Sequence, residues 1–327
     1  MADLYGQMDV HSATLLELME ADERIVVMTA DLVGSCRLTE IERRYPDRFI
    51  NVGVAEQNMV SISGGLALAG FRPVTHTFSI FSSLRACEQV RTDVFYNELP
   101  VLIVGSHSGV STGPAGPTHY SIEDMAVVRA MPGSVLCCPS DDVSAEWALR
   151  TLLDLGRPAY LRLDRNPLPR IHADASNLEL GRPVRVAGPG SGDEEVVIFA
   201  CGAMTSVSLE ALHELEARGI RTSLYDVVTL KPLDDEAILR AIKGRSLVVT
   251  VEEHTVIGGL GGAVAETLRA AGPGPPLVRV GIPDLFPQGG PPESVRARLG
   301  LTRAGVVERI SQAIEQPLTA VQSQQEE

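Results

Sequence analysis

Short apolar segments rich in β-branched residues alternate with longer amphipathic segments along most of this chain. In the first half, strands are expected at Ile25–Met28, Phe49–Val52, Pro73–Thr75, Val101–Val104, Val135–Cys138 and Ala159–Leu163. Helices are expected between them, at Ser12–Glu20, Ala55–Ala69, Ser83–Asn97, Ile122–Ala130 and Asp141–Leu153. Apolar strands separated by helices are typical of a parallel sheet covered on both sides. The pattern predicts an α/β fold of mostly parallel sheets with helices on both faces.

The alternation pauses at Pro167–Glu195, a stretch rich in Pro and Gly, and then resumes. Further strands are expected at Val196–Ala200, Thr222–Asp226, Ser246–Val251 and Leu277–Val280, and further helices at Met204–Ala217, Asp235–Ile242 and Gly261–Ala270. A length of 327 residues suits two domains. We predict a larger domain over residues 1–180, a linker over 181–194, a smaller domain over 195–316 and a disordered tail over 317–327.

The charge balance excludes several classes of partner. The chain carries 42 acidic and 28 basic residues, for a net charge of −14, which disfavours nucleic acid and anionic membranes. Its apolar runs are shorter than the ~20 residues of a membrane helix. The N-terminal residues lack the features of a signal peptide, and the five cysteines form no CxxC motif. A cytoplasmic protein with free thiols and no metal site of its own is expected.

The first candidate site lies in the stretch Phe-Ile-Asn-Val-Gly-Val-Ala-Glu-Gln-Asn-Met, residues 49–59. It joins an expected strand to an expected helix and places Glu56 in the first helical turn, directly after Val54 and Ala55. The helix dipole favours a carboxylate at that position, which would explain Glu56 without any function. Because α/β proteins bind ligands at the carboxyl ends of parallel strands, Glu56 is also a candidate functional residue.

Two further loops carry aromatic and imidazole side chains. Phe78 and Phe81 lie three residues apart beside a polar loop, where they either pack into the core or form a flat surface for a ligand ring. His107 and His119 flank a loop with three glycines. Glycine lets the backbone approach a ligand closely, and imidazole can shuttle protons or bind phosphate. The loop matches neither a Walker motif nor a dinucleotide-binding fingerprint.

Two arginines lie at the end of the last strand of the first half. Arg162 and Arg165 belong to the stretch Tyr-Leu-Arg-Leu-Asp-Arg-Asn, residues 160–166. They form either surface ion pairs or a clamp for a phosphate or carboxylate.

Taken in this order, these stretches resemble the transketolase family of thiamine diphosphate enzymes. The motifs that carry the resemblance are Val-Gly-Val-Ala-Glu-Gln-Asn-Met, Gly-Pro-Thr-His and Val-Glu-Glu-His-Thr-Val-Ile-Gly-Gly-Leu-Gly-Gly-Ala-Val, residues 251–264. The likeness extends from about Leu15 to Ile314 and is to the C-terminal half of a full-length transketolase. It implies that residues 1–180 are a pyrimidine-binding domain and residues 195–316 a transketolase C-terminal domain. Within the latter, Glu252, Glu253 and His254 are assigned to structure or interface.

The resemblance implies thiamine diphosphate as cofactor, with Mg²⁺. Glu56 would act as a catalytic residue by hydrogen-bonding N1′ of the aminopyrimidine. Phe81, with Phe78 beside it, would pack on that ring, and Asp31 would lie near the thiazolium ring. The family often has Tyr where Leu84 stands, so that side of the ring pocket is altered.

The resemblance also implies transfer of a two-carbon ketol unit from a ketose phosphate donor to a carbonyl acceptor. His107 and His119 would be catalytic residues that contact the donor and its intermediate, and Ser35 and Arg165 would bind substrate phosphate. The family usually has Asp, which recognises the acceptor's α-hydroxyl group, at the substrate-binding position occupied by Ala115.

Two more features of the family are missing. The family's diphosphate and Mg²⁺ site begins with Gly-Asp-Gly, which does not occur in this sequence. We therefore expect a partner chain, an N-terminal transketolase subunit with the Mg²⁺ ligands, in a dimer of heterodimers. The phosphate-binding Arg expected near residue 8 is also absent, and Met8 stands there. Losing one charged hydrogen bond costs about 1.5–3 kcal/mol, so a non-sugar acceptor in specialised metabolism becomes a hypothesis beside an ordinary pentose-phosphate transketolase.

Three rival interpretations stay open on the sequence. The chain also resembles the β subunit of a 2-oxoacid dehydrogenase E1 component, although Gly-Pro-Thr-His and His107 favour transketolase. Half of a deoxyxylulose-phosphate synthase would share the Glu56 motif but has an acidic residue where His107 stands. A non-catalytic partner subunit would have lost the cofactor contacts, whereas Glu56, Phe81 and both histidines are present.

Overall fold

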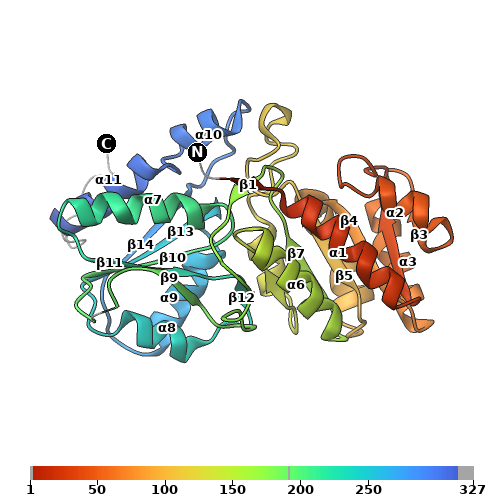
Figure 1. The fold of residues 1–327 in the computed structure, drawn as a ribbon, viewed down its shortest axis with the longest axis horizontal. Helices are drawn as coiled ribbons and strands as arrows, with labels where there is room; N and C mark the ends of the chain where they lie inside the picture. Colours follow the sequence, from red (N-terminus) through yellow and green to blue (C-terminus); the bar gives the residue numbers. More distant parts are fainter. Residues whose placement is uncertain (1–2, 191, 316–327) are drawn as a thin grey trace.

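Two lobes lie side by side, each built around one sheet (Figure 1). The computed structural model describes residues 3–190 and 192–315. The first lobe holds a seven-stranded sheet and the second a five-stranded sheet. Both are mostly parallel and both carry helices on their two faces, so the predicted fold class is confirmed. Within the described residues no helix is long and apolar enough to cross a membrane.

The seven-stranded sheet places the candidate site residues along one edge. In spatial order its strands are β12 (Thr229–Lys231), β6 (Leu136–Cys137), β7 (Ala159–Arg162), β5 (Leu102–Ser106), β4 (Arg72–Phe78), β2 (Ile25–Thr29) and β3 (Phe49–Asn51). All but β12 run parallel, so their carboxyl ends meet at the same edge. Every residue of β2 and β5 is buried, which is why these strands are apolar without alternation.

Helices of the first lobe cover both faces of its sheet. Two long helices, α1 (Gln7–Ala21) and α6 (Asp142–Asp154), pack together over one face. The other face carries α3 (Glu56–Leu68) and α5 (Asp124–Ala130). Shorter pieces are α2 (Thr39–Arg44), α4 (Cys87–Gln89), 3-10 turns at 46–48 and 113–115, and a small sheet of β1 (Leu4–Tyr5) and β8 (Leu168–Pro169).

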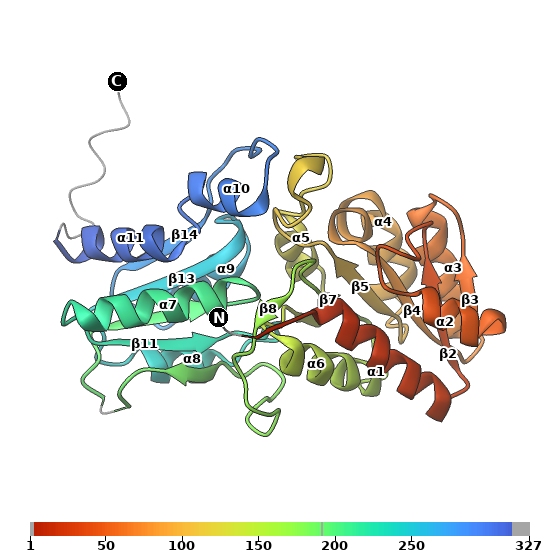
Figure 2. The ribbon, with the colours of Figure 1, turned by 45° about the horizontal axis from the view of Figure 1, so that its top comes forward.

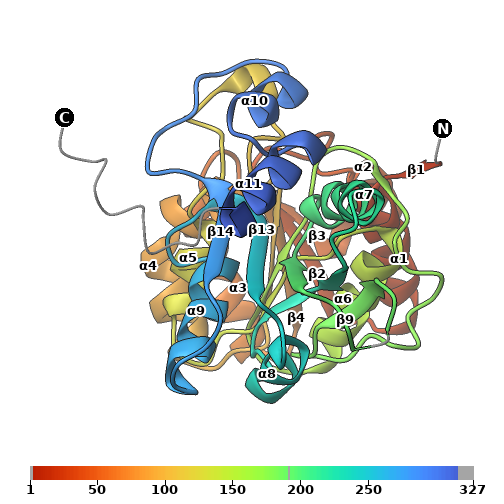
Figure 3. The ribbon, with the colours of Figure 1, turned by 90° about the vertical axis from the view of Figure 1, so that its left-hand side faces the viewer.

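The five-stranded sheet has the order β14 (Leu277–Ile282), β13 (Leu247–Thr255), β10 (Val196–Ala200), β11 (Thr222–Asp226) and β9 (Val184–Ala187). One face carries α7 (Met204–Ala217) and α11 (Arg303–Glu315), and the other α8 (Asp235–Ile242) and α9 (Leu260–Ala270) (Figure 3). The remaining helix, α10 (Pro292–Arg298), lies near the loop that follows β5 in the first lobe (Figure 2).

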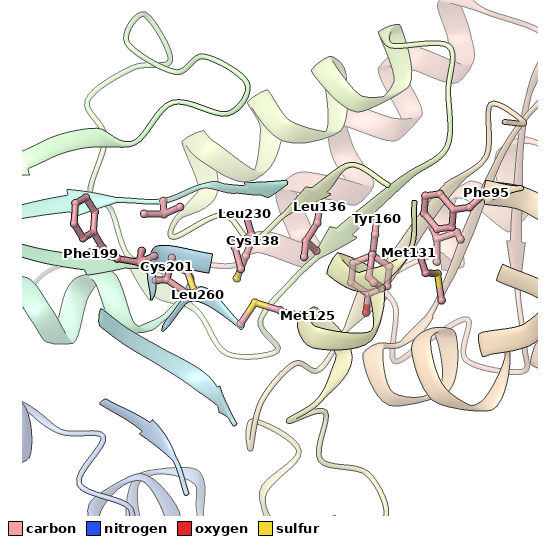
Figure 4. Close-up of a cluster of buried hydrophobic side chains, with 14 of the residues drawn as sticks. Phe95, Met125, Met131, Leu136, Cys138, Tyr160, Phe199, Cys201, Leu230 and Leu260 are labelled. Carbon is pink, nitrogen blue, oxygen red and sulfur yellow. The ribbon is translucent and has the colours of Figure 1, made fainter. Parts of the chain in front are cut away.

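The structure adds detail that the sequence pattern did not predict. The stretch expected as a linker at 181–194 contains β9, which pairs antiparallel with β11. Strand β12 follows the second lobe's β11 in sequence but pairs with β6 of the first sheet. The domain boundaries themselves stay a prediction, and the expected tail at 317–327 lies outside the described residues. One apolar cluster crosses between the lobes and joins Tyr160 and Met125 to Phe199 and Leu260 (Figure 4).

Candidate active site

Glu56 begins α3 and is nearly sealed from solvent. Only 2% of its surface is exposed, although it directly follows the loop at the carboxyl end of β3. The Nη1 atom of Arg85 donates to both of its carboxylate oxygens, at 3.0 and 3.1 Å. The Arg85 side chain keeps 46% of its surface exposed. A buried carboxylate therefore faces a cation that reaches it from the solvent side.

Arg85 also stacks on an aromatic ring of the site. Its guanidinium carbon lies 4.0 Å from the centre of the Phe81 ring. The helix expected at Ser83–Asn97 is present, but it begins earlier, at Phe81, and most of it is π-helical. Phe81–Arg85 and Val90–Phe95 form wide π-helical turns around α4. The hydroxyl group of Ser83 donates to the carbonyl oxygen of Ser79. Such π-turns are frequent at functional sites, and here one places Phe81 and Arg85 on the same side.

Four rings, from the end of β4, the π-turn after it and the loop after β5, form one group, which we call the aromatic cluster: Phe78, Phe81, His107 and His119. The rings of Phe78 and His107 stack with their centres 3.9 Å apart, and those of Phe78 and Phe81 are 5.8 Å apart. His119 lies edge-on to Phe81, with 5.4 Å between ring centres. The structure thus brings both candidate phenylalanines and both candidate histidines together, and Arg85 links Phe81 to Glu56. That these residues form one catalytic site stays a prediction.

His107 is buried and neutral near pH 7. Burial lowers its pKa to about 4, and the charges of Arg165 and Arg37 lower it further. Its Nδ1 atom lies 3.1 Å from the hydroxyl oxygen of Ser106, and its backbone has φ +58°, an uncommon value for a residue other than Gly. A neutral imidazole offers one donor and one acceptor, so His107 can hydrogen-bond an uncharged hydroxyl or carbonyl group.

The loop that carries the two histidines is anchored at several points. Backbone bonds of 2.9 Å join Gly109 and Ser121 in both directions, and the hydroxyl group of Tyr120 donates to the carbonyl oxygen of Gly113 at 2.6 Å. His119 is half-buried, with Nδ1 2.9 Å from the Thr118 hydroxyl oxygen. Ala115 is exposed in the turn between the histidines.

The other predicted site residues lie in loops at the same edge of the sheet, but within residues 3–190 and 192–315 no hydrogen bond or ring contact joins them to the aromatic cluster. The backbone N–H of Asp31 donates to the Asn51 side chain at 3.0 Å, which ties its loop to the one before Glu56. Ser35 and Arg165 are exposed in the loops after β2 and β7. Met8, where the family has a phosphate-binding Arg, is buried in the hydrophobic cluster that α1 covers.

Sequence reasoning missed two arginines. For Arg85 a signal was available, since it follows Phe81 by four residues and can stack on it within one helical turn. Arg37 follows Ser35 by two residues and pairs with Asp9 in the first turn of α1, where Nε and Oδ1 are 3.2 Å apart. It therefore brings a positive charge to the region where the sequence lacks the expected Arg near residue 8.

Arg162, by contrast, is structural. It is 3% exposed and pairs with buried Asp124 at 2.8 Å. Its Nη2 atom donates to the carbonyl oxygens of Ser121 and Glu253, both at 3.1 Å, so it fastens the two lobes together. In the described part of the chain, no three His, Cys, Asp or Glu side chains converge as a metal site.

Comparisons with known proteins agree with this arrangement. Residues 8–170 match the transketolase pyrimidine binding domain and residues 190–306 the transketolase C-terminal domain. A putative transketolase C-terminal section of Methanocaldococcus jannaschii is 36% identical over 93% of this chain and 95% of that protein. The chain belongs to the transketolase family. It is a chain of a transketolase-family enzyme, as its motifs indicated.

Two other relatives carry names of different enzymes. The 6-deoxy-6-sulfo-D-fructose transketolase subunit SqwH of Clostridium sp. (strain MSTE9) is 38% identical over 91% of each chain. A 1-deoxy-D-xylulose-5-phosphate synthase of Geobacter sulfurreducens is 37% identical over 90% of this transketolase-family chain, but only 46% of that protein is covered.

Solved structures show the same fold. A split gene transketolase, described as an inactive β4 tetramer, superposes with a TM-score of 0.86 at 34% identity and covers 95% of this chain and 99% of its own. A Pichia stipitis transketolase complex with sedoheptulose 7-phosphate superposes with a TM-score of 0.82 at 22% identity, over 96% of this chain and 46% of that one. The second likeness shows the fold alone.

Proposed function

We propose that this chain is one subunit of a split transketolase that moves a two-carbon ketol unit from a ketose phosphate donor to a carbonyl acceptor. The observation that carries the proposal is the position of Glu56, which is buried beside the aromatic cluster and faces a planar, hydrogen-bond-donating cation stacked on Phe81. Such a site suits a flat, nitrogen-containing ring better than a sugar alone.

The residues fit thiamine diphosphate, the cofactor that the family implies. The Arg85 guanidinium donates to Glu56 and stacks on Phe81 at the same time. A protonated aminopyrimidine is likewise a planar group that donates hydrogen bonds, so the placement of this guanidinium supports the proposal that such a ring binds between Glu56 and Phe81. When bound, the cofactor would supply the carbon nucleophile of ketol transfer.

The chain's own residues then have separate roles. Glu56 would hold the proton-bearing ring nitrogen through a charge-assisted hydrogen bond, and Phe81 would orient the ring. His107 and His119 would donate to and accept from the substrate's hydroxyl and carbonyl groups. Because its buried ring stays neutral, His107 can take either part at neutral pH.

Arg165, Arg37 and Ser35 would recognise the substrate's terminal phosphate. Both arginines lie close enough to His107 to depress its pKa, and both side chains are exposed toward solvent. Guanidinium groups bind phosphate with paired hydrogen bonds. This arrangement does not select the acceptor by its α-hydroxyl group, because exposed Ala115 offers no carboxylate to bind one. A non-sugar carbonyl compound would therefore fit as well as a sugar phosphate.

A partner chain would complete the site. We propose that it supplies the Gly-Asp-Gly motif, the diphosphate pocket and the Mg²⁺ ligands, in a dimer of heterodimers. The likeness to a transketolase C-terminal section and to a split gene transketolase supports this proposal.

The test is co-purification of this chain with a candidate partner that carries Gly-Asp-Gly, followed by assay with thiamine diphosphate and Mg²⁺. Ketose phosphates are paired with sugar and non-sugar acceptors, and mass spectrometry detects an acceptor heavier by one two-carbon ketol unit. The proposal predicts that product only when both chains are present. Tight cofactor binding and turnover by this chain alone would contradict it.

The same assay addresses a second candidate function. Several relatives at 35–37% identity are 1-deoxy-D-xylulose-5-phosphate synthases, which favours including that reaction. For this arm a 2-oxoacid with a methyl group replaces the ketose phosphate as donor, because the C1 methyl group of the product needs an acetyl unit, which is set free with loss of CO2. Formation of 1-deoxy-D-xylulose 5-phosphate from that donor, without ketol transfer from ketose phosphates, would replace the transketolase proposal.

A further inference from the structure

The motif Val-Glu-Glu-His at residues 251–254 ends β13 at the boundary between the two lobes. The first acidic residue, Glu252, serves its own lobe, because its carboxylate accepts from the N–H groups of Leu260 and Gly261 at the start of α9. His254 accepts from the N–H of Ala126 in α5. Glu253 differs from both, since it contacts the loop that carries the candidate catalytic histidines.

Glu253 contacts the backbone near the start of the loop that carries His107 and His119. It is 3% exposed, and its Oε1 atom accepts from the backbone N–H of Val110 at 2.8 Å. Gly109 packs so closely that a Cβ atom there would lie 2.6 Å from Cγ of Glu253. This contact adds to the Gly109–Ser121 backbone bridge that closes the same loop. The carboxylate therefore fixes the backbone two and three residues after His107.

Arg296 extends this contact to a second loop. From α10 its Nε atom donates to Oε2 of Glu253 at 2.9 Å, and its Nη2 atom lies 3.5 Å from Oδ2 of Asp164. Asp164 is 5% exposed and accepts from the N–H of Asn166 at 2.7 Å, which folds the turn that presents Arg165. The three charged side chains thus connect the histidine loop to the arginine loop.

The connection is costly to build from charged groups. Three nearly buried ions lose their hydration, and such groups seldom add net stability compared with apolar side chains of the same size. What they do provide is a fixed geometry, because each carboxylate has a directional bond to one loop backbone and shares one guanidinium. Burial also raises the pKa of Asp164 to about 6, while Arg296 opposes that shift.

We propose that Glu253 and Arg296 are positioning residues that set the distance between His107 and Arg165, and hence the fit of a sugar phosphate between them. The inference rests on the proposed function and gives the second lobe a part in it. This spacing would orient the sugar phosphate, with its carbonyl end at the histidines and its terminal phosphate at Arg165. Neither residue touches the substrate itself.

The experiment uses the two-chain complex with thiamine diphosphate and Mg²⁺ and compares Glu253→Ala with Glu253→Gln. The Ala variant should raise KM for a ketose phosphate at least tenfold, whereas Gln keeps an oxygen for Val110 N–H and should recover most of the loss. Neither variant should change cofactor affinity, measured by the thermal shift on adding thiamine diphosphate. A donor without phosphate should show a much smaller rise in KM than the phosphorylated donor.

Glu266→Ala is the matched control, because Glu266 also makes an ion pair between the lobes, but its partner at 2.8 Å is Arg129 of α5 and not the histidine loop. If Glu253→Ala fails to fold, Arg296→Gln is tested in its place, because it removes the ion pair that links Glu253 to Asp164. Equal changes in Glu253→Ala and Glu266→Ala, or equal loss with both donors, would overturn the proposal. Absence of any ketol transfer in the wild-type complex would instead contradict the proposed function.

Discussion

The Nη1 atom of Arg85 lies 3.0 and 3.1 Å from the two carboxylate oxygens of Glu56, while its guanidinium stacks on Phe81. The pair couples a nearly buried acid to an exposed base across 29 residues of sequence. It occupies the contacts that the proposed function gives to a cofactor ring. Removal of either partner should therefore have distinct consequences.

Replacing the acid should abolish catalysis. In the assembled complex, Glu56→Gln removes the charge that would hold the protonated ring nitrogen, and we expect ketol transfer to fall by about 10²–10⁴-fold. Steady-state rates at saturating cofactor measure the effect. Glu42→Gln, an exposed change in α2, should keep full activity. Near-normal rates for Glu56→Gln would favour a non-catalytic role for this chain.

Replacing the base should alter stability and cofactor response in opposite directions. Arg85→Met leaves a buried carboxylate without its cation, and we expect the free energy of unfolding without cofactor to fall by about 1–2 kcal/mol. Because the cofactor would then meet no competitor at Glu56, its stabilising thermal shift should grow. Denaturant unfolding and thermal melts of the complex measure both quantities. An unchanged thermal shift would show that Arg85 does not share the cofactor's place.

The two exposed arginines should govern recognition of phosphate. Arg165→Ala and Arg37→Ala each remove one charged hydrogen-bond donor, worth about 1.5–3 kcal/mol, so KM for phosphorylated substrates should rise roughly 10- to 100-fold. Unphosphorylated substrates should change little. Arg43→Ala serves as control, since Arg43 pairs with Glu40 and is 70% exposed. A uniform loss across all substrates would argue against a phosphate contact.

A gain of function is expected at the turn between the histidines. Ala115 is exposed, so Ala115→Asp can be accommodated without disturbing the core. If the missing carboxylate is what relaxes acceptor choice, the variant should improve kcat/KM for α-hydroxy aldehydes at least tenfold relative to acceptors without that hydroxyl group. Competition assays with paired acceptors give the ratio. The same ratio in Ala115→Asp and in the exposed control Ala13→Asp would refute the idea.

Two buried histidines should make the fold sensitive to acid. The rings of His11 and His76 meet edge-on at 4.9 Å, and none of their nitrogens has a hydrogen-bond partner within the described residues. Burial lowers the pKa of His11 from 6.5 to about 4. Below pH 6.5 the unfolded chain therefore binds protons that the folded chain refuses, and stability falls until about pH 4.

For His11 alone this loss amounts to about 3 kcal/mol, by the relation between pKa difference and free energy. His11→Phe removes that titration, so its unfolding free energy should depend less steeply on pH between 6.5 and 4. Urea unfolding of wild type and variant at several pH values measures the slopes. If wild type and variant showed the same pH dependence of the unfolding free energy, the pKa of His11 would be the same in the folded and the unfolded chain, which would contradict the prediction.

Local periodicity in the sequence determined the fold class and most of the elements. The strands at 196–200 and 222–226 and the helices at 204–217 and 235–242 match their expected bounds, because burial on one face or two leaves a repeat that is readable within each segment. The motifs that identify the family also lie within single short segments of the sequence. Glu56, Phe78, Phe81, His107 and His119 could be chosen because each lies at or after the carboxyl end of a parallel strand, and all such ends share one edge.

Only the tertiary structure decided which side chains meet. No periodicity within a segment indicates that Glu253 would reach Val110, 143 residues away, or that β12 would join the first lobe's sheet. Those contacts depend on how the lobes pack, which is set by shape and burial over the whole chain. The π-turn at Phe81–Arg85, and with it the pairing of Arg85 with Glu56, was likewise visible only in the tertiary structure. The sequence therefore determined the parts of the site, and packing between distant segments determined their geometry.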